Sequence, residues 1–216
     1  MSSKWSIIVD FDGTITKTDA EVFVASKMVP AAQQKLKSLF DAYEAIEIGL
    51  LDYFQGYLEL VDIEDDHFQS IVVQTPVRND LVSLIREFHC QIPVTIVSEG
   101  LDVYIAPLLE KHGLGDVPLV CNHVEIAGGR AVIRPAAGAE PCERCLSCKG
   151  ALVRRIKSER RDKKVVVIGN GASDFCAAKE ADVIFARDTL AKLCRDNDLL
   201  HFVWKNADDI RLNVPF

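Results

Sequence analysis

The sequence predicts an α/β fold, a Rossmann-like and mostly parallel sheet flanked by helices, with a small helical cap inserted after the first strand. Three observations lead to this prediction. Residues 5–9 form a short apolar, β-branched run that ends in Asp10, which is typical of a buried strand followed by a turn. Residues 19–75 then show helical spacing of their apolar side chains. After Pro76, helical and strand patterns alternate, as they do in parallel sheets covered by helices.

The helical insert is expected to form a cap. After Pro30, apolar side chains recur every three or four residues between positions 36 and 50, which is the spacing of one helix face. Another helical pattern covers residues 67–74. We therefore expect a core domain made of residues 1–16 and 76–216 and a cap domain made of residues 17–75.

The remaining elements follow in order. Helical patterns cover residues 80–90, 101–113, 149–161, 173–182 and 189–197, and strand patterns cover residues 92–97, 163–169 and 183–186. Two further strand patterns, at residues 119–126 and 130–135, flank a glycine pair and predict a β-hairpin. Pro107 lies within a helical pattern, so we expect a kink or a helix end near it.

Charge and hydropathy limit the partners. The chain has 216 residues, of which 25 are Lys or Arg and 32 are Asp or Glu, giving a net charge of −7. Such a chain lacks the basic surface that nucleic acids require, so we expect no nucleic-acid partner. Nine of the acidic residues lie between positions 41 and 75, where there is no Lys or Arg. No apolar run approaches the ~20 residues of a membrane span, so we expect no membrane partner.

The cysteine count and the start of the chain predict a cytoplasmic location. The first apolar run ends at Asp10, which makes it too short for a secretory signal. Seven cysteines, an odd number, do not suggest a disulfide framework. We expect a monomer or a homodimer.

Three predicted strands end in small, acidic or hydroxylated residues. These residues are Asp10-Phe11-Asp12-Gly13-Thr14, Ser98-Glu99 and Gly169-Asn170-Gly171-Ala172-Ser173-Asp174. Ligands of open α/β sheets bind beyond the carboxyl ends of the strands, so these groups are expected to converge on one site. Each group alone is also compatible with a turn or a helix cap.

The chemistry of this site favours phosphoryl transfer. Asp10 and Asp12 are two residues apart, so in an extended backbone their carboxylates leave the same side. Two close carboxylates repel each other unless a cation lies between them, and Mg²⁺ prefers such oxygen ligands. Lys149, at the start of a predicted helix, is a candidate for a second positive charge. Positioning and charge neutralisation by such groups are what phosphoryl transfer needs.

The order of these motifs resembles a known family. DFDGT after a strand, then VSEG, then Lys149, then GNGASD are similar to the four-motif signature of haloacid-dehalogenase (HAD) superfamily phosphatases. The resemblance covers about residues 6 to 205. Because the helical insert follows the first motif, the chain resembles the phosphoserine-phosphatase-like branch. Within that branch it is similar to the phosphatases of methionine salvage, which act on an enol phosphate.

The resemblance implies a role for each motif residue. Asp10 is expected to attack phosphorus and form an aspartyl-phosphate, and Asp12 to act as general acid and then general base. Mg²⁺ is expected at Asp10, the backbone carbonyl of Asp12, Asn170 and Asp174. Residues expected to bind phosphate or substrate are Thr14, Asp19, Ser98, Glu99, Gly100 and Lys149. The ligand is then a small-molecule phosphomonoester.

One position departs from the family pattern. The fourth motif usually begins Gly-Asp, whereas this chain has Asn170 at the matching position, so the metal site has one negative charge fewer. Two alternatives stay open. One is a non-catalytic phosphometabolite-binding protein with a degenerate metal site. The other is a phosphoserine phosphatase, although residues 41–75 contain no arginine for a substrate carboxylate.

Three cysteines precede Lys149 at three-residue intervals: Cys142, Cys145 and Cys148. They predict either a Zn²⁺ site, with Cys121 or His123 as fourth ligand, or a loop whose thiols pack or oxidise beside the active site. A second complete Cys pair is missing, so the loop is the preferred interpretation. Cys90, Cys176 and Cys194 lie on helical patterns and are expected in the core.

Overall fold

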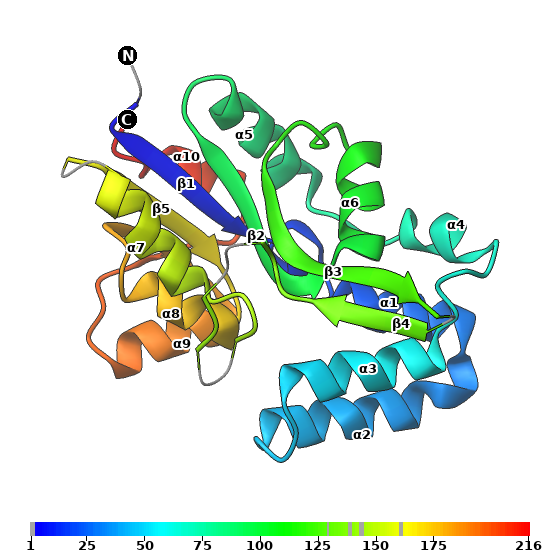
Figure 1. The fold of residues 1–216 in the computed structure, drawn as a ribbon. Coiled ribbons are helices and arrows are strands. Elements are labelled where there is room, and N and C mark those ends of the chain that lie inside the picture. The colour runs from blue at the N-terminus through cyan, green and yellow to red at the C-terminus, as the bar shows by residue number, and fades with distance from the viewer. Residues whose placement is uncertain (1–2, 129, 138–139, 143–144, 160–161) are drawn as a thin grey trace.

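The computed structural model describes residues 3–128, 130–137, 140–142, 145–159 and 162–216. Within them, seven strands form one sheet in the order β4-β3-β2-β1-β5-β6-β7 (Figure 1). The strands are β1 (Trp5–Asp10), β2 (Val94–Leu101), β3 (Leu119–Ala127), β4 (Arg130–Arg134), β5 (Lys164–Gly169), β6 (Val183–Ala186) and β7 (Phe202–Val203). All neighbouring pairs are parallel except β3–β4, an antiparallel hairpin. The predicted fold class and hairpin are confirmed.

Helices account for most of the remaining elements. They are α1 (Ala20–Met28), α2 (Gln33–Glu44), α3 (Leu50–Leu60), α4 (Phe68–Val72), α5 (Asn79–His89), α6 (Asp102–Lys111), α7 (Lys149–Glu159), α8 (Phe175–Ala178), α9 (Asp188–Asp196) and α10 (Ala207–Arg211). Short helical turns are η1 (Phe11–Ile15), η2 (Pro30–Ala32) and η3 (Ala172–Asp174). None of the described helices is long and apolar enough to cross a bilayer.

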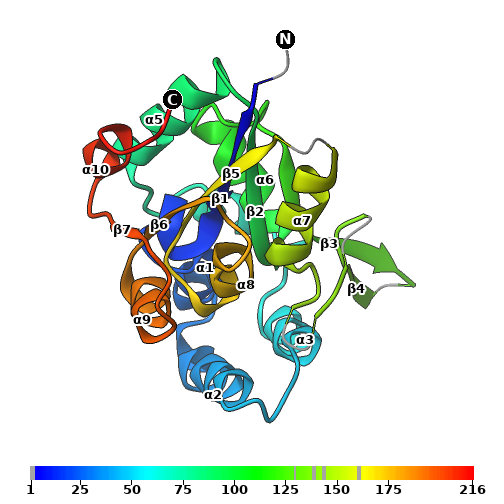
Figure 2. The same ribbon diagram turned by 90° about the vertical axis from the view of Figure 1, so that its left-hand side faces the viewer.

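Both faces of the sheet are covered, because side chains alternate along each strand. Ile7 and Val9 of β1 belong to an apolar cluster that includes buried residues of α5, α6 and α10. Ile8, between them, packs with Val153 of α7 and Ala177 of α8 on the other face. Figure 2 shows α7 on one side of β1 and β5, with α5 and α10 on the other. This double coverage explains why the central strands consist mostly of Ile and Val.

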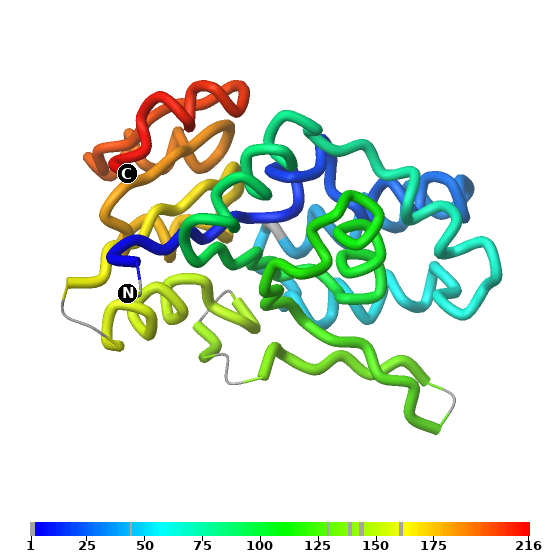
Figure 3. The backbone as a smooth tube through the Cα atoms, turned by 90° about the horizontal axis from the view of Figure 1, so that it is seen from above, coloured from blue at the N-terminus to red at the C-terminus, as the bar shows by residue number. Residues whose placement is uncertain are grey.

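Helices α1 to α4 form the segment inserted after the first motif. Thr16 and Val77 form an antiparallel bridge, and the Lys17 N–H donates to the Pro76 carbonyl at 2.8 Å, so the chain leaves and re-enters the sheet region through paired segments. Helices α2 and α3 lie side by side, and α3 contacts β4 (Figure 1). The termini lie at the other end of the molecule (Figure 3), where the Trp5 and Phe216 ring centroids are 5.9 Å apart.

Helix α6 continues past Pro107 to Lys111 rather than ending near the proline. Proline has no N–H, so the Val103 carbonyl four residues earlier lacks its usual helical partner. The Gln69 side-chain amide of α4 donates to that carbonyl at 3.3 Å. The hydrogen bond replaces the missing one and ties α4 to the helix that follows the second motif.

Two further differences from the sequence prediction concern element ends. Strand β2 does not stop at Val97 but runs through Ser98 to Leu101, with a shift of register against β3 in between. The short elements β7 and α10 were not predicted. Residues 202–203 give too short a pattern, and α10 is marked only by Asn206, whose side chain accepts two backbone N–H groups of the first turn.

The cysteines on helical patterns lie in three different environments. Cys194 on α9 is buried, as predicted. The prediction for Cys90 is wrong, because α5 ends just before this residue and leaves the thiol exposed. Cys176 on α8 is half-buried rather than in the core, because it faces the loop that precedes α7.

Candidate active site

The carboxyl ends of β2, β1 and β5 lie side by side in the sheet and open into one cleft of about 640 Å³. Asp10 ends β1, Ser98 lies in the irregular end of β2, and Asn170 directly follows β5. All three line the cleft. The structure therefore brings together the strand ends from which the sequence predicted a site.

Lys149 is the buried cation of this cluster. Its side chain is 1% exposed, and its Nζ donates to Asp10 Oδ1 and, at 2.6 Å, to Asp174 Oδ1. Burial alone would lower the pKa of Lys149, but the two carboxylates outweigh that effect and raise it. A buried ion of this kind is tolerated only with such partners, because desolvating an unpaired charge costs several kcal/mol. Lys149 therefore stays protonated and links the first motif to the fourth.

Asp12 lies between the first motif and β2. Its Oδ1 accepts the Ala20 N–H at 2.8 Å, and its Oδ2 lies 3.3 Å from Ser98 Oγ, which in turn accepts the Gly100 N–H at 2.9 Å. A Cβ atom at position 100 would clash with Tyr104 Oη and lie 3.1 Å from Asp12 Oδ2. Only glycine leaves room for these oxygens to converge. The Tyr104 hydroxyl is buried with no hydrogen-bond partner among the described residues.

The acidic residues are held partly in their neutral form. Burial raises the pKa of Asp10 to about 7, reinforced by the charge of Asp174 and partly offset by Lys149. Burial, together with the nearby charge of Asp19, raises the pKa of Asp12 to about 8. A carboxyl with a pKa near 8 is protonated at neutral pH and can donate a proton to a leaving group.

The donor set suits a hard divalent cation. Asp10, Asp12 and Asn170 offer oxygen atoms to the same end of the cleft, and Asp174 lies behind them. The three carboxyl groups of Asp10, Asp12 and Asp174 are accompanied by one buried cation among the described residues of this cluster, Lys149. An excess of carboxylate over positive charge, with oxygen donors only, is what Mg²⁺ sites in proteins provide. The residues present therefore fit Mg²⁺.

The fourth motif is built around Asp174. Its Oδ2 accepts the N–H groups of Asn170 and Gly171, both at 3.0 Å, while its Oδ1 accepts Lys149. Asp174 thus shapes the loop that presents Asn170, and its oxygens keep further lone pairs for a metal ion. The Thr14 hydroxyl donates to Asn170 Oδ1 at 2.8 Å, so Thr14 contacts the fourth motif directly.

Glu99 connects the second motif to the loop before Lys149. Its Oε2 accepts the N–H of Leu146 at 3.1 Å and of Ser147 at 3.4 Å. Its Oε1 is buried with no partner among the described residues, and the residue lines the cleft. Burial raises the pKa of Glu99 to about 7, against the lowering effect of Lys149. Glu99 is therefore placed to hold this loop and to face a ligand.

The side of the cleft formed by residues between 17 and 75 combines acidic and aromatic residues. Asp19 precedes α1, and Glu21 on α1 accepts the Tyr53 hydroxyl at 3.2 Å through Oε1. Burial raises the pKa of Glu21 well above its usual value, reinforced by the charges of Asp12 and Asp19. Glu21 Oε2 has no partner among the described residues. The apolar lining residues here are Phe40, Tyr43, Leu50, Tyr53 and Phe54.

The profile of the family described as "Putative Phosphatase" matches residues 5–213, nearly the whole chain. The chain belongs to this family. It is a phosphatase. It is 32% identical over 208 residues to the 2-hydroxy-3-keto-5-methylthiopentenyl-1-phosphate phosphatase of Lysinibacillus sphaericus (strain C3-41), covering 92% of this chain and 87% of the relative. A protein of the same name from Brevibacillus brevis (strain 47 / JCM 6285 / NBRC 100599) is 31% identical over 216 residues, covering 97% and 95%.

Solved structures share the fold of this phosphatase. A substrate-bound phosphoserine phosphatase complex superimposes with a TM-score of 0.73 at 17% identity, covering 99% of this chain and 100% of the other. A phospho-aspartyl intermediate analogue of phosphoserine phosphatase gives a TM-score of 0.70 at 17% identity, covering 98% of each chain. The phosphatase therefore has the HAD-like fold that its four motifs suggested.

Sequence reasoning missed two polar side chains of the phosphatase. Tyr104 is the third residue of the helix after the second motif, and Glu21 is a single acidic residue within an apolar helical run. An isolated carboxylate in such a run is a signal that could have been used, since burying it requires a partner. Nothing in the sequence distinguishes Tyr104 from a core tyrosine.

Proposed function

We propose that the phosphatase hydrolyses a small phosphomonoester with Asp10 as nucleophile. One arrangement carries this proposal. Asp10 lines the cleft and accepts a hydrogen bond from the buried Lys149. Asp12 lies beside it, and its raised pKa favours the protonated carboxyl group. A nucleophile and a general acid on neighbouring residues are what a two-step phosphoryl transfer requires.

The two steps follow from these roles. An Asp10 carboxylate oxygen forms a bond to phosphorus while the bond from phosphorus to the ester oxygen breaks, and Asp12 gives its proton to that leaving oxygen. Water then attacks the phosphorus of the aspartyl-phosphate, with the now ionised Asp12 accepting the water proton. Inorganic phosphate leaves, Asp10 regains its carboxylate, and Asp12 is again protonated. Lys149 holds Asp10 in place and neutralises charge on the transferring group.

Mg²⁺ would be held by the Asp10 carboxylate, the Asp12 backbone carbonyl and the Asn170 side-chain carbonyl, with Asp174 as a further candidate. When bound, it neutralises negative charge on the phosphoryl oxygens. Its positive charge would also lower the pKa of Asp10, which burial and then the charge of Asp174 raise.

The phosphate would be bound by Ser98 of β2 and by Lys149 of α7. Glu99 and Gly100, which follow Ser98 on β2, are proposed for the same subsite. Thr14 is also proposed for this subsite, although its hydroxyl donates to Asn170 here and would have to be shared or redirected. A hydroxyl, an ammonium and backbone N–H groups together suit a phosphate dianion.

The remainder of the substrate would lie under residues 17–75, which we propose act as a cap domain over the core. The aromatic side chains Phe40, Tyr43 and Phe54 suit an apolar or thioether tail, because sulfur packs well against aromatic rings. Asp19 and the unpartnered Glu21 Oε2 suit hydroxyl or carbonyl groups. None of the described cleft residues is an arginine, which disfavours a substrate carboxylate such as that of phosphoserine. The enol phosphate 2-hydroxy-3-keto-5-methylthiopentenyl-1-phosphate has these features.

A panel of phosphomonoesters tests the proposed substrate. We expect hydrolysis of p-nitrophenyl phosphate that requires Mg²⁺ and stops with EDTA. We also expect kcat/KM for the methylthio enol phosphate to exceed that for phosphoserine by at least about 100-fold, because no described cleft residue is an arginine that could pair with the carboxylate. Preference for phosphoserine would contradict the substrate proposal. Tight phosphomonoester binding without hydrolysis of any panel member at saturating Mg²⁺ would favour the non-catalytic binding protein.

Asn170 variants test its proposed place at the metal. Asn170→Ala removes a carbonyl ligand and is expected to raise the Mg²⁺ concentration for half-maximal activity by about tenfold or more. Asn170→Asp keeps the oxygen and adds a charge, so it should need no more Mg²⁺ than the native protein. Titration of activity with Mg²⁺ measures both. Equal Mg²⁺ requirements in the native protein and Asn170→Ala would remove Asn170 from the ligand set.

A further inference from the structure

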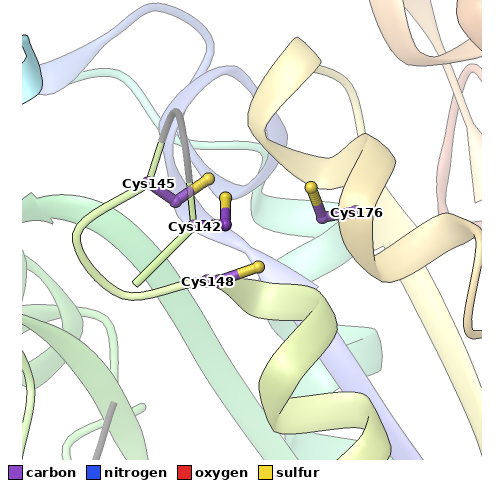
Figure 4. Close-up of side chains that lie close together, drawn as sticks. All are labelled: Cys142, Cys145, Cys148 and Cys176. Atoms are coloured by element: carbon purple, nitrogen blue, oxygen red, sulfur yellow. The ribbon is translucent and has the colours of Figure 1, made fainter. Parts of the chain in front are cut away.

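Four cysteine sulfurs lie together beside the active site, in a group that the phosphatase reaction does not use. The Sγ atoms of Cys142, Cys145, Cys148 and Cys176 are all within 4.8 Å of one another. Figure 4 shows Cys142 and Cys145 on the loop before α7, Cys148 just before that helix, and Cys176 on α8, with the four side chains gathered between these segments. The structure describes no disulfide among them.

We propose that this group, named here the tetracysteine site, binds one Zn²⁺ as a closed structural centre. Tetrahedral Zn²⁺ takes four thiolates at about 2.3 Å, which places the sulfurs about 3.8 Å apart. The observed separations are all within 4.8 Å, so none exceeds that spacing by more than about 1 Å. Four thiolates are also the ligand set of structural rather than catalytic zinc, because no coordination position stays open for water or substrate.

The fourth ligand differs from the one expected from sequence. Cys121 and His123 lie on β3, outside the tetracysteine site, and His123 Nδ1 is 3.0 Å from Asp102. Cys176, expected in the core, completes the site instead.

Backbone hydrogen bonds restrict the positions of the three cysteines that precede Lys149. The Cys142 N–H donates to the Cys145 carbonyl at 3.0 Å, and the Cys148 N–H donates to the Glu140 carbonyl at 3.0 Å. Glu99 fixes the segment between Cys145 and Cys148 by accepting its N–H groups. These restraints limit the freedom of Cys142, Cys145 and Cys148, which lowers the conformational cost of binding an ion.

Helices α7 and α8 approach unusually closely at this point. A Cβ atom at Gly150 would lie 2.5 Å from the Cys176 carbonyl oxygen and 3.1 Å from the Cys176 Cβ. Only glycine permits this approach, which brings Cys148 and Cys176 within reach of one ion. Lys179 supplies positive charge near Cys176, which favours a zinc–tetrathiolate with its net charge of −2.

The tetracysteine site would fix two active-site residues at once. Cys148 precedes Lys149, and Cys176 follows Asp174 by two residues, while Lys149 and Asp174 bond each other at 2.6 Å. An ion bound to both cysteines would clamp the third motif to the fourth. The proposal does not depend on the hydrolytic reaction, because an inactive protein would bind the ion equally well.

Zinc content of the reduced protein, with and without Asp10→Asn, tests this inference. After reduction and removal of loosely bound metal, we expect one Zn²⁺ per chain in both forms, and Co²⁺ replacement should give the intense charge-transfer absorption of tetrahedral thiolate ligation. Cys176→Ser is expected to weaken Zn²⁺ binding by at least about 100-fold, since even outer-shell changes cost about 10–100-fold. Cys90→Ser, an exposed cysteine on the opposite face, is the control and should leave binding unchanged.

Three outcomes would overturn the tetracysteine site. They are fully reduced protein that binds no Zn²⁺ or Co²⁺, equal metal affinity in the native protein and Cys176→Ser, and a mass two hydrogens lower that maps a disulfide to these cysteines in protein purified anaerobically. The thermal unfolding midpoint adds a readout independent of both metal analysis and activity. It should rise with Zn²⁺ in the native and Cys90→Ser proteins but not in Cys176→Ser.

Discussion

Asp10→Asn is expected to reduce kcat/KM for p-nitrophenyl phosphate by at least about 10⁴-fold, because an amide oxygen cannot serve as the nucleophile in an aspartyl-phosphate route. The substitution is nearly isosteric, and the amide oxygen can still accept Lys149, so the fold should persist. Steady-state kinetics at saturating Mg²⁺ measure the effect, and circular dichroism checks the fold.

A matched control separates loss of the nucleophile from general damage. Asp66→Asn makes the same chemical change at an exposed position between α3 and α4 and should leave kcat/KM unchanged. If Asp10→Asn kept more than about a tenth of native activity while Asp66→Asn behaved as expected, Asp10 would not be the nucleophile.

Lys149→Met is expected to have the largest effect on stability. It leaves the buried carboxyl groups of Asp10 and Asp174 facing each other without a cation, and breaking a buried pair in this way costs about 3–5 kcal/mol. Activity should fall by at least about 10³-fold in the same protein, since Lys149 also fixes the nucleophile. Urea unfolding gives the free energy of unfolding, and phosphatase assays give kcat.

Lys157→Met provides the comparison on the same helix. Lys157 pairs with Asp182 at 2.9 Å, but its side chain is 31% exposed, so its loss should cost less than about 1 kcal/mol and little activity. Similar destabilisation by the two substitutions would contradict the assignment of Lys149 as the buried charge that holds the site together.

Much of the site could be predicted because strand ends are marked in the sequence. Short Ile- and Val-rich runs locate β1, β2 and β5, and a parallel sheet must then bring Asp10, Ser98 and Asn170 to one edge. The HAD-like fold and the phosphatase family, both expected from these motifs, are confirmed. The proposed roles of the individual residues stay predictions for the experiments above.

The sequence could not reveal contacts that depend on helix rotation and packing. The Tyr104 hydroxyl and Asp12 Oδ2 both lie close to position 100 only because that position has no side chain, and this arrangement has no periodic signature. Cys176 joins the three loop cysteines only because Gly150 lets α8 approach α7. The hydrogen bond from Gln69 to the carbonyl freed by Pro107 likewise joins residues far apart in the chain. Each depends on tertiary contacts between segments that local patterns treat separately.

The acidic residues between positions 41 and 75 and the residues that line the cleft lie on different sides of the same segment. Eight of its nine acidic side chains are described, and all eight are exposed, on α2 and α3 and in the loops that follow these helices, whereas the cleft side of the same segment is aromatic. In the proposed cap role, this segment would present apolar surface to a substrate and negative charge to solvent. This arrangement favours a small monophosphate with an apolar tail over a polyanion.

Acid quenching during turnover tests the covalent route at Asp10 most directly. Native protein mixed with Mg²⁺ and excess phosphomonoester is quenched at early times, digested and analysed by mass spectrometry. The predicted result is one phosphoryl group on the peptide containing Asp10, mapped to Asp10 and absent from Asp10→Asn. A phosphoryl group on any other residue, or steady turnover with no phosphopeptide at any time point, would contradict Asp10 as the nucleophile.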